Sequence, residues 1–306
     1  MDRAACFGLA SSAGVFGSIA DMLLDIYKHS GFRFIVKWVD DFLVIALPSD
    51  SWSEADFMQL TGLLGVPWSP EKTRPLATVQ RYIGFDWDLA HRTVSLPQEK
   101  TDATISLVLA WLAPEARFSR KSTASLHGKL IRASCIFVLI RPFTRSFPHF
   151  LKAFTSERAK LKPPPFLLAD LEWIRFLLQS LPNSLPLRPS SPVDIGWWGD
   201  ASTSFGIGIV IQGHWAVWKY APGFEVGPLK SHDIGWAEAV AVELALRIAF
   251  QLHIIRESLH AGTRFLVRSD NQGVVAVVNS GRSFSTNTNK VLKEVLYPFP
   301  SSFLII

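Results

Sequence analysis

The chain has 306 residues, 48% of them hydrophobic, and a formal net charge of +5. A hydrophobic fraction of this size excludes a disordered chain, and the length suggests about two compact units. The mild basic excess is compatible with a nucleic-acid partner but does not establish one, because many basic proteins bind none.

The two cysteines, Cys6 and Cys135, lie far apart in apolar surroundings. They form neither a disulfide framework nor a zinc-binding spacing, which favours a reducing compartment. The apolar runs are too short to span a bilayer, and the N-terminus lacks the layout of a signal peptide. We therefore expect an intracellular protein of the cytoplasm or nucleus, neither secreted nor inserted in a membrane.

Apolar periodicity and turn residues predict the secondary structure of the first hundred residues. The predicted elements are a helix at Ala13–Tyr27, a hairpin of Phe32–Trp38 and Phe42–Leu47, a helix at Ser53–Leu64, and a hairpin of Tyr82–Asp88 and Thr93–Leu96. The first hairpin carries two acids, Asp40 and Asp41, at its tip. Adjacent acids between apolar strands form either a plain polar turn or a metal-binding pair.

The middle of the chain is predicted to be helical and basic. Helices are expected at Thr101–Ala113, Lys121–Phe137 and Leu168–Leu181, with a linker at Pro182–Pro192. Lys129 and Arg132 belong to a run of basic residues here. That run predicts either a surface that follows a nucleic-acid backbone or a merely solvated helix face.

After Pro192 the apolar pattern changes to a series of strands and helices, which predicts a mixed sheet flanked by helices. The expected elements are strands at Val193–Trp198, Gly206–Ile211, His214–Lys219 and Phe265–Arg268, and helices at Ile234–Leu252 and Gly273–Asn279. Asp200 and Asp270 each follow a strand, so both carboxylates are expected at one edge of the sheet.

The helix at Ile234–Leu252 has two acids with different expected surroundings. At ~100° per residue, Glu238 shares the apolar face, whereas Glu243 lies on the opposite side, one turn before Arg247. Glu243 is therefore expected in an exposed ion pair with Arg247. The inward Glu238 needs a partner, for which a metal ion is a good candidate.

The order of motifs in the first half resembles reverse transcriptases of retroelements, of the gypsy-like or tyrosine-recombinase type. The motifs are Phe7–Gly17, Val39-Asp40-Asp41, Ser69–Thr73 and Tyr82–Phe85. They are similar to the family's glycine motif, Val-Asp-Asp hairpin, lysine motif and primer grip. The resemblance implies that Asp40 and Asp41 bind metal, that Lys72 lies near the leaving pyrophosphate, and that Phe7, Gly8 and Gly84 contact nucleic acid. It also implies that Lys129 and Arg132 belong to the thumb.

The second half resembles the ribonuclease H family, in which acids like Asp200, Glu238 and Asp270 hold two Mg²⁺ or Mn²⁺ ions and cleave the RNA strand of an RNA–DNA hybrid. The resemblance implies a partial palm at 1–98, a helical thumb or connection at 99–190 and a ribonuclease H-like domain at 191–306, in an α+β and α/β fold. The chain looks truncated at both ends, without the upstream metal-binding aspartate or the fourth ribonuclease H ligand, for which Glu294 is the nearest acid.

Two functions are supported by the sequence, whereas nothing in it speaks positively for a third, a domesticated structural or interaction protein. The first is a fragment of an RNA-directed DNA polymerase with a ribonuclease H domain, which would bind template–primer and hybrid, with dNTP in the intact polymerase. Without the upstream aspartate we expect no polymerase activity. The alternative is a non-catalytic nucleic-acid-binding retroelement remnant. Tight binding of divalent ions near Asp200 would favour the enzyme.

Overall fold

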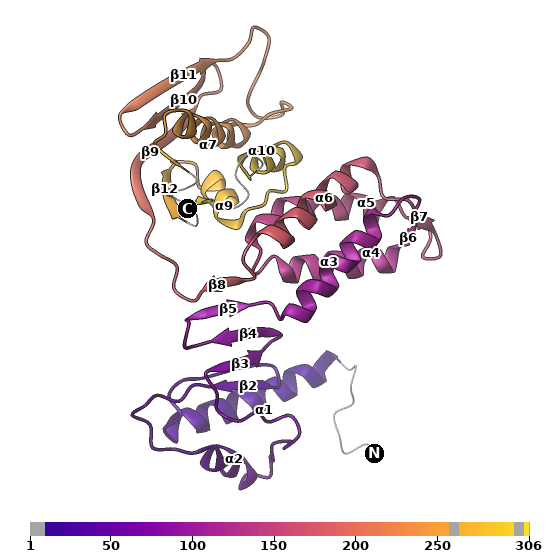
Figure 1. Cartoon of the computed structure of the whole chain (residues 1–306), viewed down its shortest axis with the longest axis vertical. Coiled ribbons are helices and arrows are strands. Elements are labelled where there is room, and N and C mark those ends of the chain that lie inside the picture. Colours follow the sequence, from indigo (N-terminus) through magenta and orange to yellow (C-terminus); the bar gives the residue numbers. More distant parts are fainter. Residues whose placement is uncertain (1–9, 257–262, 297–302, 306) are drawn as a thin grey trace. The chain divides into compact units, whose positions relative to one another are not determined.

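The computed structural model describes residues 10–256, 263–296 and 303–305 (Figure 1). The chain is a mixed α/β protein that divides into two compact units, Met1–Val94 and Ser95–Ile306. In the part of the chain that is described, no helix is both long and apolar enough to cross a membrane.

The first unit packs two helices and two hairpins around a small aromatic core. Its elements are α1 (Ala10–His29), β1 (Ile35–Trp38), β2 (Asp41–Val44), α2 (Glu54–Gly62), β3 (Val79–Tyr82), β4 (Phe85–Asp88) and β5 (Thr93–Ser95). Tyr27 at the end of α1 is fully buried and stacks on Phe57 of α2, with 4.3 Å between the ring centroids. Its hydroxyl donates to the Phe57 carbonyl oxygen and accepts from Trp68 Nε1, both at 2.7 Å. The burial of Tyr27 therefore leaves no polar group unsatisfied.

The first predicted hairpin is confirmed. β1 pairs with β2 in antiparallel register, with Trp38 opposite Asp41, and the turn consists of Val39 and Asp40. Val39 has a φ of 54°, which strains a β-branched residue. Asp40 therefore lies in the turn itself, and Asp41 is the first residue of β2.

The second predicted hairpin is wrong in detail, because Tyr82–Asp88 is not one strand. The segment bends at Ile83 and Gly84, with φ values of 43° and 75°, so that β3 pairs antiparallel with β4. Two successive residues with positive φ make the tight turn typical of two-residue hairpins. A β-branched Ile83 concealed this turn, although Gly84 was a signal for it. β5 lies beside β4 in the same sheet.

The second unit begins with a helical part. Its elements are α3 (Gln98–Leu112), β6 (Phe118–Ser119), α4 (Arg120–Ala133), the 3₁₀ helix η1 (Val138–Arg145), α5 (Ser146–Lys152), β7 (Lys160–Leu161), α6 (Pro165–Ser180) and β8 (Ser184–Pro186). The predicted helix Lys121–Phe137 ends early, at Ala133, and η1 contains Pro142, which cannot donate to a helical backbone. The apolar faces of these helices form a core that includes Val108, Leu130 and Leu171.

The second unit continues with a mixed sheet, as predicted. Its elements are β9 (Val193–Ala201), β10 (Gly206–Ile211), β11 (His214–Lys219), α7 (Ile234–Gln251), β12 (Thr263–Arg268), α9 (Gln272–Ser280), α10 (Thr286–Leu296) and β13 (Phe303–Ile305). The strand order is β11-β10-β9-β12-β13, with antiparallel pairing on the β11 side of β9 and parallel pairing from β9 to β13. α7 packs on β9 and β10, where Trp197, Ile207 and Ile209 are buried with its alanines.

Small residues let α7 approach the sheet closely. A methyl group added at Gly199 of β9 would lie 3.1 Å from Cβ of Ala241, which is tighter than an ordinary van der Waals contact. Ala237, Ala241 and Ala245 are all fully buried along this side of α7. The residue after Gly199 is Asp200, so the close approach brings the helix near the strand end that carries this acid.

Three polar contacts join the helical part of the second unit to its sheet part. Lys293 Nζ of α10 lies 2.6 and 2.8 Å from the two carboxylate oxygens of Asp170, on α6. Asn289 Nδ2 donates to the carbonyl oxygen of Pro142 at 2.8 Å, and Arg141 donates to that of Ser280 at 3.3 Å. The helical part and the sheet part belong to one compact unit, Ser95–Ile306.

Candidate metal centre

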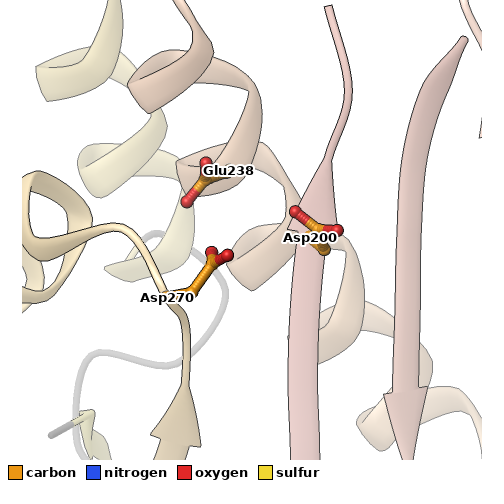
Figure 2. Close-up of side chains that lie close together, drawn as sticks. All are labelled: Asp200, Glu238 and Asp270. Atoms are coloured by element: carbon orange, nitrogen blue, oxygen red, sulfur yellow. The ribbon is translucent and has the colours of Figure 1, made fainter.

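Three carboxylates from three elements converge at one edge of the sheet in the second unit. Asp200 lies near the end of β9, Glu238 on the second turn of α7, and Asp270 two residues after β12 (Figure 2). One carboxylate oxygen from each lies within 4.8 Å of the other two. The side chains point toward one another in Figure 2. The sequence predicts that Asp200 and Asp270 follow neighbouring strands and that Glu238 faces inward.

The start of α7 is fixed by its cap, which in turn places Glu238. The side chain of Asp233 accepts a hydrogen bond from the backbone N–H of Trp236 at 2.7 Å. Such a cap satisfies one of the free N–H groups at a helix start and stabilises the first turn by about 1 kcal/mol. Glu238 lies five residues after the capping residue, on the face that packs against the sheet.

Glu238 is buried and bound by two donors that the sequence interpretation missed. It is 6% exposed, and its oxygens accept hydrogen bonds from Ser269 Oγ and Asn271 Nδ2, both at 3.1 Å. Ser269 and Asn271 flank Asp270 in the turn that follows β12. Asn271 also caps α9, because its Oδ1 accepts from the backbone N–H of Gly273 at 2.8 Å. The Asn-Gln-Gly start of a helix was the available signal for this residue.

The surroundings of Glu238 disfavour its charged form when no cation is present. Burial raises the pKa of the Glu238 carboxyl, the hydrogen bonds from Asn271 and Ser269 oppose that rise, and the negative charges of Asp270 and Asp200 add to it. A cation between the three carboxylates would remove the repulsion. An oxygen-only donor set of carboxylates suits Mg²⁺ or Mn²⁺ rather than a soft metal. The side chains present therefore fit a hard divalent ion.

A groove beside the acids is bordered by exposed aromatic side chains. Its volume is about 660 Å³, and its lining includes Asp200 and Asp270 together with Trp198, Phe205 and Trp215. Trp215 is 75% exposed, and Trp198 is covered in part by the guanidinium of Arg268, 5.2 Å from the ring centroid. The acids therefore lie at an open surface, where a polymer can reach them.

The acids of the first unit occupy a different environment. Asp40 and Asp41 are exposed, and they line a cavity of about 870 Å³ together with Lys72 and Gly84. Lys72 is an exposed residue in a turn, where its backbone N–H donates to the Ser69 carbonyl oxygen at 3.1 Å. Among the described residues, no third acid, histidine or cysteine joins Asp40 and Asp41 in a potential metal-binding group.

The remaining predicted site residues do not belong to either cluster. Lys129 and Arg132 are exposed on α4. Phe7 and Gly8 lie outside the described residues. Glu294, the nearest downstream acid, lies 3.7 Å from Arg247 and not with the three converging carboxylates.

Glu243 and Arg247 form the predicted i,i+4 ion pair at 2.5 Å. The side chain of Glu243 is only 14% exposed, however, so the expectation of a solvated acid is wrong. The reason is that α10 packs against α7 and shields this face, which the periodicity of α7 alone does not reveal.

No protein-family model and no curated protein matches the chain. Among solved structures, the chain is similar to a foamy viral protease-reverse transcriptase (dRH) in complex with ds DNA. The TM-score is 0.41 and the sequence identity 17%, over 96% of this chain and 49% of the other. The chain thus spans about half the length of the structure that it resembles at this distant level.

Proposed function

We propose that Asp200, Glu238 and Asp270 form a divalent-metal site that cleaves the RNA strand of an RNA–DNA hybrid, in a ribonuclease H-like domain at 191–306. The observation that carries the proposal is the convergence of these three carboxylates, each from a different element, to within 4.8 Å of one another. Exposed acids gather by chance on many surfaces, but a buried glutamate facing two exposed aspartates is costly unless a cation joins them.

Two Mg²⁺ or Mn²⁺ ions, when bound, would activate a water molecule and stabilise the leaving oxygen of a phosphodiester. The protein's own contribution is to hold the ligands in place. Ser269 and Asn271 orient both oxygens of Glu238. Substitution of residues that orient metal ligands commonly lowers metal affinity or activity by about 10- to 100-fold. The open edge beside Asp200 and Asp270 leaves room for a nucleic-acid backbone.

The test uses the purified full chain and a hybrid with labelled RNA, in Mg²⁺ and in Mn²⁺. We expect metal-dependent cleavage of the RNA strand that Asp270→Asn removes. Glu225→Gln is the matched control, because Glu225 is an exposed acid whose ion pair with Lys230 lies outside the site. Equal cleavage by wild type and Asp270→Asn would reject the assignment, and so would calorimetry showing that neither protein binds Mn²⁺.

A second function, a non-catalytic nucleic-acid-binding remnant, is favoured by one specific observation. The two hydrogen bonds to Glu238 satisfy the buried carboxylate in part without any metal ion. The arrangement could therefore persist in a protein that has lost catalysis. Hybrid binding of equal strength with EDTA and with Mn²⁺, and no cleavage, would support this remnant over the enzyme.

For the first unit we propose a partial reverse transcriptase palm at 1–98, followed by a thumb or connection at 99–190, without polymerase activity. The cavity shared by Asp40, Asp41, Lys72 and Gly84 supports the palm. The exposure of Asp40, Asp41 and Lys72, and the lack of a third ligand among the described residues, support the inactivity. Template–primer and dNTP binding by this unit would then be weak.

A further inference from the structure

The loop between α9 and α10, residues 281–285, holds an aromatic side chain in solvent. Phe284 is 91% exposed, more than any other phenylalanine among the described residues. Exposing a ring of this size gives up the burial that stabilises aromatic side chains elsewhere in the chain. Single exposed apolar residues are common, so the surroundings of Phe284 decide whether the exposure has a use.

The loop is fixed in place by buried contacts. Gly281 ends α9 in the left-handed conformation, with a φ of 64°. The backbone N–H of Ser283 donates to Asn289 Oδ1 at 3.2 Å, and Asn289, which is 5% exposed, donates in turn to the Pro142 carbonyl oxygen at 2.8 Å. Phe284 is therefore presented by an anchored loop.

Arginines from two segments lie at this loop, and one of them contacts the ring. The guanidinium of Arg145 in η1 lies 4.6 Å from the centroid of the Phe284 ring, within the range of a cation–π contact. Arg282 is exposed two residues before Phe284. Arg141 lies beside Gly281 at the start of the loop, and burial lowers its pKa, as does the charge of Arg282 to a smaller extent. Within the described part of the chain, neither Arg145 nor Arg282 forms an ion pair with an acid.

We propose that this Arg–Phe surface, made of Arg141, Arg145, Arg282 and Phe284, binds single-stranded nucleic acid. A base stacks on the ring face of Phe284 that Arg145 leaves open, and the arginines contact the flanking phosphates. Stacking on an aromatic side chain requires a base that is not already stacked in a duplex, which selects a single strand. The inference rests on the proposed function only in taking nucleic acid as the substrate class.

An anionic nucleic acid suits this surface better than a protein partner does. The surface combines an exposed aromatic ring with three arginines, none of which forms an ion pair with an acid among the residues that the structure describes. Single-strand sites combine the same two features, a basic surface that follows the backbone and rings that accept bases. The Asp and Glu side chains of an acidic peptide would pair with the cations but supply no aromatic ring to stack on Phe284.

The experiment measures binding of labelled oligothymidylate to the full chain in EDTA, at several salt concentrations. We expect Phe284→Ala to weaken binding about tenfold, within the range for loss of one stacked base, and Phe284→Tyr to restore it. Arg282→Ala should also weaken binding and reduce the slope of log affinity against log salt by about 0.7, because one phosphate contact is lost. Both side chains are exposed, so the fold should tolerate their removal.

Phe166→Ala and Arg158→Ala are the matched controls, since both residues are exposed elsewhere in the same unit. They should bind as wild type does. Unchanged oligothymidylate affinity in Phe284→Ala at every salt concentration would overturn the proposal. So would a loss confined to polyglutamate binding, which would instead indicate an acidic protein partner.

Failure of the metal site can be told apart from failure of this surface. Asp270→Asn should keep full oligothymidylate binding in EDTA, and Phe284→Ala should keep full Mn²⁺ binding. If no metal binds while Phe284→Ala still weakens the complex, the proposed nuclease is wrong and the single-strand surface stands.

Discussion

The acids of the two units differ in their burial and in the side chains that hydrogen-bond to their carboxylates. In the first unit, Asp40 and Asp41 lie at an exposed hairpin turn. In the second unit, Glu238 is buried, and two side chains from the turn after β12 bind both of its oxygens. The comparison shows that acidic residues in a motif do not make a site by themselves. A metal centre also needs neighbours that fix each carboxylate before the ion binds.

The largest expected difference between the two sets of acids lies in metal-dependent chemistry. Asp200→Asn should lower hybrid cleavage about 1,000-fold or more, because loss of one contact to reacting charge already costs about 100- to 1,000-fold in other enzymes. The double variant Asp40→Asn/Asp41→Asn should cleave as wild type does. Initial rates of cleavage in Mn²⁺ measure both effects.

The wild type and the variant Asp40→Asn test whether the first unit is a polymerase. Primer extension with Mg²⁺ and dNTP should show no incorporation by the wild type. Incorporation that Asp40→Asn abolishes would contradict the view that the exposed acids of the hairpin turn are unsupported.

A second buried acid, Asp170, extends the comparison from function to stability. Burial raises the pKa of the Asp170 carboxyl, and the hydrogen bond and charge of Lys293 oppose that rise. The folded protein therefore holds this proton more tightly than the unfolded chain. Its contribution to stability is fully present at low pH and is lost as the pH rises through the raised pKa.

Lys293→Met should move this loss to higher pH and destabilise the protein by about 3 kcal/mol near neutral pH, because it leaves a buried carboxylate without its partner. Chemical unfolding across the acidic and neutral range measures the effect. Lys290→Met, an exposed lysine on the same helix, is the control. The double variant Asp170→Asn/Lys293→Met should recover most of the stability. A loss of stability in Lys290→Met equal to that in Lys293→Met would show that the ion pair is not the cause.

A smaller effect is expected at Asn271, which orients Glu238. Asn271→Ser keeps an oxygen that can cap α9 but loses the amide donor to Glu238, so Mn²⁺ affinity should fall about 10- to 100-fold with little change in Tm. Isothermal titration measures the affinity, and thermal unfolding checks the cap. A variant that binds Mn²⁺ like wild type would mean that the hydrogen bond from Asn271 does not support the site.

The sequence predicted much of the geometry around Glu238 and little of what binds it. Helical periodicity placed Glu238 inward, and its 6% exposure confirms this. Strand ends placed Asp200 and Asp270 at one edge of the sheet. The sequence signals Asn271 as a helix cap, but it does not show that Ser269 and Asn271 donate to Glu238, because their direction depends on the turn after β12 and on the start of α9 in space. The partial burial of Glu243 was missed for a similar reason, since α10 is distant in sequence.

The close contact between Gly199 and Ala241 has a consequence for ion selectivity under the proposed function. Gly199 has a hydrogen atom where an alanine would have a methyl group, so the strand that carries Asp200 can lie close to the helix that carries Glu238. If the three carboxylates bind a metal ion as proposed, the absence of a side chain at Gly199 contributes to how closely Asp200 and Glu238 can approach each other. The substitution Gly199→Ala would push α7 away from β9 by a few tenths of an ångström. The wider site would favour ions with longer metal–oxygen bonds, such as Ca²⁺, over Mg²⁺.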